Sequence, residues 1–375
     1  MNKIYSIVFL LLATSIIGCG SKNLSVDSSE MDIMVGQMVM VGFRGMDAAP
    51  DSFIVKDIRD AKIGGVILFS KDCALNSTER NISDYKQVED LTASLQKQAR
   101  IPLFVAADQE GGLICRFAVD RGFPSSLSAA ELGNSGDLKA AFRAGKAAGK
   151  TLSSVGVNVD FAPVVDVNRN AVNPVIAALQ RSFSDDPVIV ADFAKAFIDG
   201  LHSEKVISCL KHFPGHGSSA GDSHKGFTDV TDSWSEDELI PYRKLINDHK
   251  VDMVMTAHIY NNKLDKKYPA TLSRSVITGL LRNELGFKGV VVTDDMQMQA
   301  VSGEFGFKDS VFRAVDAGAD ILLFGNNLIY EPGLGIKAVG AIKELVREGR
   351  ISERRIRQSY ERIMLLKNQS TLRIN

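Results

Sequence analysis

Residues 207–217 read Ile207-Ser208-Cys209-Leu210-Lys211-His212-Phe213-Pro214-Gly215-His216-Gly217, an apolar run that ends in polar side chains and passes into a glycine-rich loop. A short apolar run of this kind predicts a strand that is buried on both faces of a parallel sheet. Glycine makes the loop conformationally permissive, while lysine and histidine give it more proton-transfer capacity than a structural loop requires. The stretch therefore predicts a buried strand that delivers reactive side chains to a loop.

Similar apolar runs, rich in Val, Ile and Phe, recur along the chain. Together with residues 207–212 they number eight: 37–43, 65–69, 103–107, 157–167, 207–212, 251–258, 290–293 and 321–324. Segments with helical periodicity lie between them, for example around residues 88–95, 190–201 and 311–315. This alternation predicts an α/β fold, a single (β/α)8 barrel rather than a doubly wound sheet, closed by a helical tail over residues 335–366.

The N-terminus predicts export and lipidation. One lysine precedes an apolar run over residues 4–17, and residues 15–19 resemble a bacterial lipobox that ends in Gly18-Cys19. We expect residues 1–18 to be a signal peptide of the lipoprotein type and Cys19 to be lipidated; an ordinary signal peptide with a chance cysteine is the alternative.

Residues 19–30 are polar and predict a flexible tether, which leaves residues 31–375 for the barrel and its C-terminal helices. The expected location is extracytoplasmic, with the protein anchored to a membrane of the bacterial cell envelope.

Composition narrows the class of partner. The chain has 375 residues, of which 45% are hydrophobic, so it can bury a large core. Its formal net charge is −1 and its pI is about 6.6, without a long basic run. The electrostatic pattern of a nucleic-acid-binding protein is missing, and we expect no nucleic-acid partner.

Polar residues follow five of the eight apolar runs. In a (β/α)8 barrel the active site forms where strands end, so these residues are expected to share one face of the barrel. A single Asp or His at such a position is more often a strand-end cap, but five in phase are hard to assign to structure alone. They are Asp108 to Gly112, Asp166, Lys211-His212, His258 and Asp294-Asp295.

These motifs make the chain resemble glycoside hydrolase family 3, and most closely its single-domain bacterial β-N-acetylhexosaminidases. The resemblance runs from about residue 33 to the last expected helix. It rests on Asp108-Gln109-Glu110-Gly111-Gly112 with Arg116, on Phe161 to Val167, on Arg181-Ser182-Phe183, on Lys211 to Gly217 with Asp222-Ser223-His224, and on Val292-Thr293-Asp294-Asp295-Met296.

The resemblance implies a retaining mechanism with a covalent glycosyl-enzyme. The residue that matches the family's nucleophile is Asp294, and the adjacent Asp295 is its competitor. The matching acid/base is His224, with Asp222 as its partner, because an imidazole can protonate the leaving oxygen and then accept a proton from water. Asp222 would hold the imidazole in one tautomer and stabilise its charged form.

The remaining matches imply substrate binding. Five residues correspond to those that hold the sugar in the minus-one site: Asp108, Arg116, Arg181, Lys211 and His212. Asp166 and His258 are left open as residues of either the site or its support, and His216 is expected to shape the loop rather than to react.

Two local departures and one alternative accompany this interpretation. Leu113 stands where the family often has Arg, and Gln180 stands where an acidic residue is common, which puts fine specificity in doubt. A metal site on His212, His216 and His224 is a weak alternative, because their spacing lacks a carboxylate ligand on a helix, and we expect neither a metal nor another cofactor.

Residues 235–238 (Ser-Glu-Asp-Glu) predict a capping box that opens a helix.

The function expected from the resemblance is that of a membrane-tethered exo-β-N-acetylglucosaminidase acting on peptidoglycan fragments or other glycans. The alternatives are a β-N-acetylglucosaminide phosphorylase or a β-glucosidase of the same family. From another class comes a catalytically inactive, carbohydrate-binding lipoprotein on the same barrel.

Overall fold

The computed structural model describes residues 28–223 and 226–369. The expected signal peptide, Cys19 and the tether up to residue 27 therefore lie outside the described residues, as does His224. The first helix, α1 (Ser28–Gln37), begins three residues before the barrel start expected at residue 31. No helix among the described residues is long and apolar enough to cross a membrane.

Eight parallel strands form the barrel, and each corresponds to one of the eight apolar runs. Their order in the sheet is β10-β1-β2-β3-β6-β7-β8-β9, and a parallel bridge between Val292 and Ile321 joins the two ends. All their residues are buried, as expected for strands covered on both faces. The bounds are β1 Val39–Gly42, β2 Gly65–Ile67, β3 Phe104–Ala107, β6 Val159–Asp160, β7 Ile207–Phe213, β8 Met253–Thr256, β9 Val290–Thr293 and β10 Leu322–Phe324. The predicted (β/α)8 fold is confirmed.

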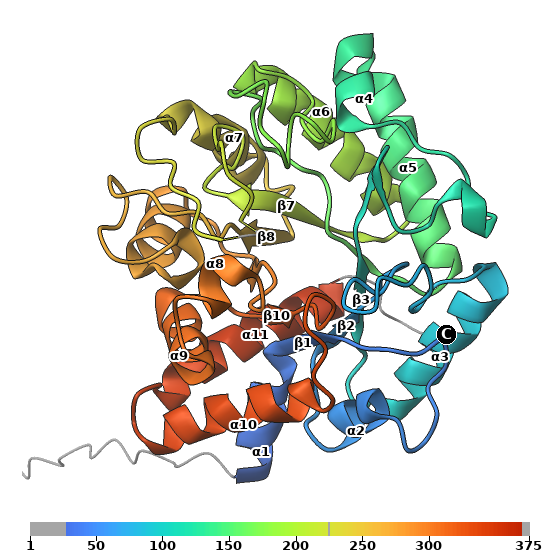
Figure 1. Ribbon diagram of the computed structural model, residues 1–375, viewed down its shortest axis with the longest axis vertical. Coiled ribbons are helices and arrows are strands. Elements are labelled where there is room, and N and C mark those ends of the chain that lie inside the picture. Colours follow the sequence, from blue (N-terminus) through green and yellow to red (C-terminus); the bar gives the residue numbers. More distant parts are fainter. Residues whose placement is uncertain (1–27, 224–225, 370–375) are drawn as a thin grey trace, which may run out of the picture.

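Helices surround this ring of strands (Figure 1). The predicted helical tail is two helices, α10, which follows the last strand, and α11, which packs against α1. The helices are α2 Phe53–Arg59, α3 Tyr85–Gln98, α4 Ala129–Ser135, α5 Leu138–Ser154, α6 Pro187–Ser203, α7 Ile240–Asn247, the π-helix Ser275–Glu284, α8 Gln299–Ser302, α9 Phe307–Ala317, α10 Leu334–Arg347 and α11 Glu353–Gln369; short 3-10 turns cover Val119–Arg121, Glu236–Leu239 and Ala270–Leu272.

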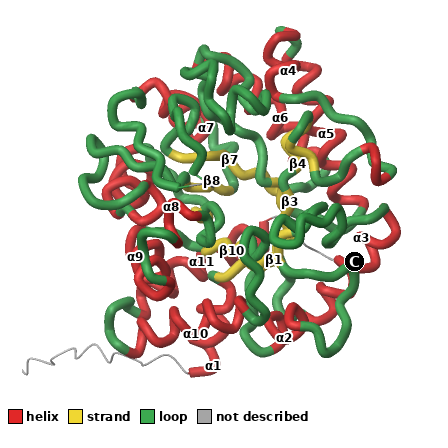
Figure 2. Tube along the Cα trace, viewed as in Figure 1, coloured by secondary structure: helices red, strands yellow, loops and turns green. Residues whose placement is uncertain are grey.

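A small hairpin extends the end of β3. It consists of β4 (Gln109–Gly111) and β5 (Ile114–Cys115), which pair antiparallel. The first strand of the hairpin is therefore formed by residues of the Asp108 to Gly112 motif. Loops gather around and in front of the strands on the face turned to the viewer in Figure 2.

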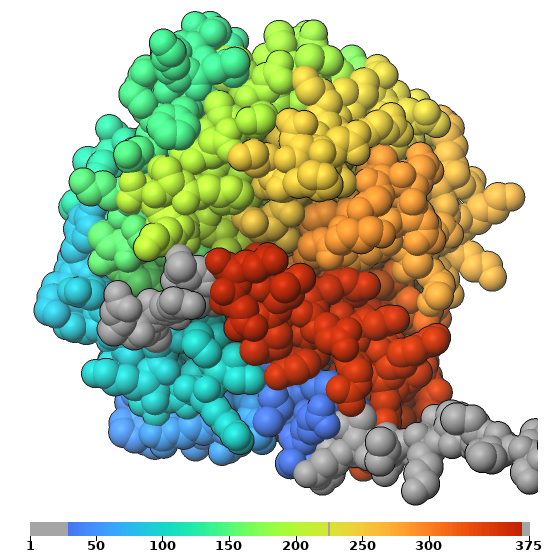
Figure 3. Space-filling model, turned by 180° about the vertical axis from the view of Figure 1, so that it is seen from behind, coloured from blue at the N-terminus to red at the C-terminus, as the bar shows by residue number. Residues whose placement is uncertain are grey.

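On the opposite face the C-terminal residues run across the middle (Figure 3). The Lys367 amine of α11 enters the barrel there and donates hydrogen bonds to the carbonyl oxygens of Gly64 (2.8 Å) and Pro102 (2.7 Å), which precede β2 and β3, and to Oε1 of Gln37 (2.7 Å). Burial lowers the pKa of Lys367 to about 7. One buried amine thus ties α11 and α1 to the start of two strands.

The predicted capping box at residues 235–238 is wrong. Ser235 makes no side-chain cap, and the segment forms a 3-10 turn before α7. Glu238 is buried and accepts a hydrogen bond from the backbone N–H of Gly217 instead (3.0 Å). The tertiary contact replaces the local one.

We predict that Lys367→Met destabilises the fold by about 2–3 kcal/mol at pH 7, because three buried acceptors lose their hydrogen-bond donor. The pKa of Lys367 lies below its ordinary value of 10.5, so the folded wild-type protein holds fewer protons than the unfolded chain at intermediate pH and gains stability as the pH rises. The loss caused by the substitution should therefore be larger at pH 9 than at pH 7. Urea unfolding at the two pH values measures this, with the exposed Lys86→Met as control. An equal loss at both values would contradict the pH dependence.

Candidate active site

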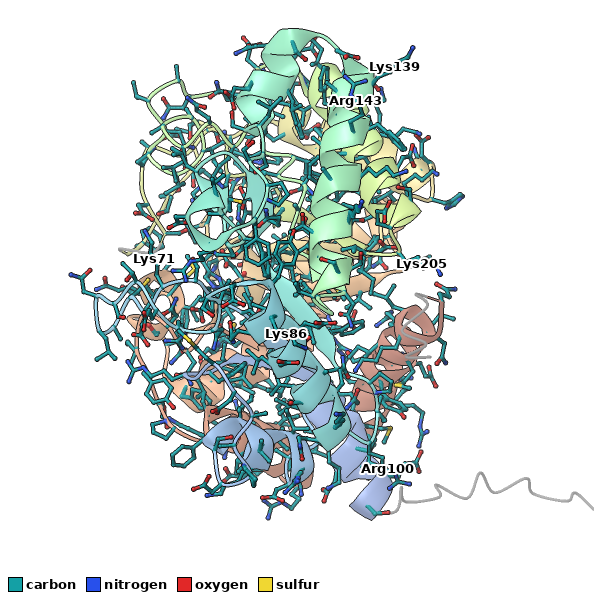
Figure 4. The ribbon with its side chains drawn as sticks, turned by 90° about the vertical axis from the view of Figure 1, so that its right-hand side faces the viewer. Lys71, Lys86, Arg100, Lys139, Arg143 and Lys205 are labelled. Atoms are coloured by element: carbon teal, nitrogen blue, oxygen red, sulfur yellow. The ribbon has the colours of Figure 1, made fainter. Side chains whose placement is uncertain are left out.

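A cavity of about 470 Å³ opens at the carboxyl ends of the barrel strands. Its lining includes residues at or just beyond the ends of seven of the eight strands, from Ile67 at the end of β2 to Gly325 after β10. Lys71 lies on its rim, and Figure 4 shows Lys71 on the side of the molecule opposite to Lys205, which precedes β7. The cavity is therefore on the face where barrel enzymes place their chemistry.

Seven of the eight residues predicted for the site line this one cavity. They are Asp108, Arg116, Arg181, Lys211, His212, Asp222 and Asp294. The eighth, His224, lies outside the described residues. The strand ends had predicted four of the seven, and the family resemblance had added Arg116, Arg181 and Asp222.

A buried cluster of alternating charges forms one wall of the cavity. The amine of Lys211 lies 2.8 Å from Oδ1 of Asp108 and 2.7 Å from Oε1 of Glu110, so two carboxylates share one cation. Arg181 donates two parallel hydrogen bonds to Glu110, from Nε (2.7 Å) and Nη2 (2.8 Å), and Arg116 donates one to Asp108 (2.8 Å). The two parallel bonds between Arg181 and Glu110 fix the relative orientation of these side chains and also pair their charges.

Mutual attraction keeps this cluster ionised despite its burial. Burial alone would raise the pKa of Asp108, but Lys211 and Arg116 outweigh it and hold that pKa well below its ordinary value. Burial opposes the charge of Glu110 in the same way, and Arg181 and Lys211 lower its pKa. The pKa values of Lys211 and Arg181 are raised, because their carboxylate partners outweigh desolvation. The cluster presents fixed charges to a polar ligand such as a sugar.

A further carboxyl group lies beside the cluster and behaves differently. Asp160, at the end of β6, is fully buried, and its Oδ1 accepts a hydrogen bond from the N–H of Gln109 (2.9 Å). Burial raises the pKa of Asp160 well above its ordinary value, with Asp108 and Glu110 adding to the effect. Burial thus favours the neutral form of Asp160, and Lys211 makes its close contacts with Asp108 and Glu110.

Asp166 supports the site rather than lining it. Its carboxylate accepts hydrogen bonds from Nδ1 of His212 (2.7 Å), from the N–H of His212 (3.1 Å) and from the N–H of His216 (2.8 Å). Arg181, which can only donate, lies 3.3 Å from Nε2 of His212, so that nitrogen is the acceptor and the ring proton is on Nδ1. Asp166 therefore sets both the position and the tautomer of His212.

The loop after β7 is held by buried polar side chains from other loops. Nδ2 of Asn173 donates to the carbonyl oxygens of His216 (2.8 Å) and Gly217 (3.1 Å), and Glu238 accepts from the N–H of Gly217. An alanine Cβ at Gly217 would lie 1.7 Å from the carbonyl oxygen of Val167, so only glycine permits this approach. The loop that carries Asp222 is thus packed against two neighbouring loops.

The two aspartates after β9 have different roles. Both line the cavity, but Oδ1 of Asp295 accepts from the N–H groups of Gln297 (3.0 Å) and Gly325 (2.8 Å), which ties it to the next strand. Oδ1 of Asp294 accepts a hydrogen bond from the N–H of Asp295 (2.8 Å). Nε2 of His258 donates to the carbonyl oxygen of Asp295 (2.9 Å) and so supports this turn. Asp295 thus holds the turn against β10, and the role of Asp294 as nucleophile stays a prediction.

The sequence did not reveal the roles of three residues that organise the site. Glu110 stood in the quoted Asp108 to Gly112 motif, and its carboxylate next to several expected cations was a usable signal. Asn173 lies in a polar loop segment without a recognisable motif. Glu238 belonged to the predicted capping box, and that local pattern gave no sign of its contact with Gly217. Among the described residues, no group of three or more His, Cys, Asp or Glu side chains is placed to hold a metal ion.

Comparisons with known proteins agree with one another. The model of the family described as "Glycosyl hydrolase family 3 N terminal domain" matches residues 30–366. A beta-hexosaminidase A of Pseudoalteromonas piscicida is 38% identical over 283 residues, which cover 70% of this chain and 45% of that protein. A beta-hexosaminidase of Tolumonas auensis is 36% identical over 277 residues, with 72% and 78% covered.

A solved structure has the same fold over nearly the whole chain. It is a glycoside hydrolase family 3 beta-N-acetylglucosaminidase from Paenibacillus sp. str. FPU-7, with a TM-score of 0.84 and 37% identity. The likeness covers 92% of this chain and 63% of the Paenibacillus chain. This chain therefore spans less than two thirds of the Pseudoalteromonas and Paenibacillus proteins.

We predict that Glu110→Gln destabilises the protein by about 3–5 kcal/mol at pH 7, because Arg181 and Lys211 lose a buried counter-charge. The pKa of Glu110 is lowered in the folded state, so its contribution is present above the ordinary value of 4.5 and is lost as the pH falls toward the folded value. The difference in unfolding free energy between wild type and variant should narrow below pH 4.5. Urea unfolding over this pH range measures the difference, with the exposed Glu89→Gln as control. Equal effects of the two substitutions on the free energy of unfolding would contradict the prediction.

Proposed function

The chain belongs to glycoside hydrolase family 3, and we propose that it is a retaining exo-β-N-acetylglucosaminidase that releases terminal β-linked N-acetylglucosamine from glycans. The observation that carries the proposal is the convergence of Asp294, Asp222 and the charged cluster around Lys211 on one cavity at the strand ends. The activity named for the relatives and for the Paenibacillus structure supports the same substrate class.

In the proposed reaction Asp294 attacks the anomeric carbon and forms a covalent glycosyl-enzyme. His224, with Asp222 as its partner, protonates the leaving oxygen and then takes a proton from the water that releases the sugar. Asp108, Arg116, Arg181, Lys211 and His212 bind the hydroxyl groups of the sugar and orient its ring. The shared Lys211 and the bidentate Arg181 keep these groups in place before substrate arrives.

Phosphorolysis is a second candidate reaction on the same site. Phosphate would replace water in the second step, and a histidine would repel it less than a second carboxylate would. A requirement for phosphate separates the two reactions.

We predict that the purified protein hydrolyses 4-nitrophenyl β-N-acetylglucosaminide in preference to the β-glucoside, without added phosphate. Asp294→Ala should lower kcat by at least about 10³-fold, because the nucleophile of the first step is removed. Steady-state kinetics measure both, with the exposed Asp232→Ala as a variant that should keep wild-type activity. Failure of wild type on both substrates, with and without phosphate, would contradict the enzyme assignment and favour a binding protein.

We also propose that the chain is a lipoprotein of the bacterial cell envelope whose substrates are peptidoglycan fragments or other glycans outside the cytoplasm. The support is the lipobox-like segment that ends in Gly18-Cys19, together with a polar stretch before α1. Acyl chains would anchor the protein firmly, since each buried CH₂ contributes about 0.8 kcal/mol.

We predict that the full chain, expressed in a bacterium, incorporates a labelled fatty acid and partitions into a detergent phase. Cys19→Ala should abolish both, because it removes the only thiol available at that cleavage site. An unlabelled wild-type protein that is released as a soluble species would refute lipidation and support an ordinary signal peptide.

A further inference from the structure

The side chain of His216 joins both ends of the turn that leads to Asp222. It is 3% exposed, its Nδ1 lies 2.7 Å from Oγ of Ser219, and its Nε2 lies 3.1 Å from Oγ of Ser223. Ser223 is itself 2% exposed, whereas the preceding Asp222 is half-buried and lines the cavity. Ser223 is therefore held in the interior, while the neighbouring Asp222 faces the cavity.

The hydrogen-bond directions at His216 follow from Ser219. Its Oγ has a single proton, which goes to the carbonyl oxygen of His216 (3.0 Å), so it accepts from Nδ1–H of His216 and from Nδ2 of Asn173 (3.1 Å). With the ring proton on Nδ1, Nε2 is an acceptor. The hydroxyl of Ser223 must then donate to Nε2, which makes this contact a specific donor–acceptor pair.

The imidazole is held rigidly and stays neutral. Its backbone N–H donates to the same Asp166 carboxylate that orients His212, and its carbonyl oxygen accepts from Asn173. Burial lowers the pKa of His216 to about 4; Asp166 opposes this shift, while His212 and Arg181 add to it. Glu238, whose pKa burial raises to about 7, also packs on this loop. At neutral pH the ring therefore keeps the acceptor that Ser223 needs.

We propose that His216 is a positioning residue, which fixes the Asp222-bearing segment through the hydroxyl of Ser223 and so sets the acid/base step of catalysis. The inference rests on the proposed function, in which Asp222 is the partner of the acid/base histidine. In this proposal His216 itself neither binds the sugar nor takes part in bond cleavage. It acts only through Ser223. The carboxylate of Asp166 then connects the sugar-binding His212 with the acid/base segment.

The test uses the full chain and a series of β-N-acetylglucosaminides that differ in leaving group. A misplaced general acid slows the departure of a poor leaving group such as phenol or a second sugar, whereas dinitrophenol leaves without protonation. A folding defect would instead lower kcat/KM equally for every substrate. The ratio between substrates thus separates positioning from structure.

For Ser223→Ala we expect kcat/KM to fall about 10–100-fold on the phenyl glycoside and the disaccharide, within the range of a general acid's contribution, and less than about threefold on the dinitrophenyl glycoside. Ser223→Thr, which keeps the hydroxyl, should restore the wild-type ratio. Ser223→Cys keeps a weaker donor and should fall between them, and it carries the comparison if Ser223→Ala does not fold. The exposed Ser233→Ala is the matched control.

Equal losses on all substrates, or no loss on any, would overturn the inference while leaving the proposed function intact. A wild-type protein that cleaves none of these glycosides would remove the proposed function, and the inference with it.

Discussion

The site depends on the pairing of the buried Lys211 amine with two carboxylates. A lysine in the interior of a barrel is costly unless it is paired, and here two carboxylates, Asp108 and Glu110, contact it at 2.8 and 2.7 Å. Pairing joins the end of β7 to the hairpin that follows β3, and Glu110 extends the link to Arg181 on a third loop. The arrangement that makes the lysine tolerable is therefore also the arrangement that places the candidate sugar-binding groups.

Another carboxylate, that of Asp166, fixes the segment at and after the end of β7. Asp166 receives three hydrogen bonds from His212 and His216, which lie on either side of Phe213-Pro214 at the end of β7. His212 faces the cavity, while His216 faces the turn that ends at Ser223. The proposed sugar-binding His212 and the proposed acid/base segment thus share one buried hydrogen-bond acceptor. Charged groups in the cluster are fixed before a substrate arrives, as a site complementary to a transition state requires.

The barrel and most of the site could be predicted from the sequence because their signals are local. Each buried strand is a continuous apolar run, and the polar residue that follows it, such as Asp294 after β9, marks the strand end directly. The supporting contacts could not be predicted in this way. Glu238 lies 21 positions from Gly217, and the local pattern around it favoured a helix cap that the tertiary contact displaced. Asn173 likewise acts through contacts with a loop more than 40 positions away, which no spacing rule reveals.

The most direct test of the account is the identity of the residue that becomes glycosylated. A slowly hydrolysed, fluorinated N-acetylglucosaminyl fluoride should accumulate as a covalent adduct, and peptide mass spectrometry locates it. Our account predicts a single adduct of one sugar on the peptide that contains Asp294, at the carboxylate of that residue. An adduct on Asp295 or on a residue outside the cavity, or turnover that begins with the inverted product and never forms an adduct, would contradict it.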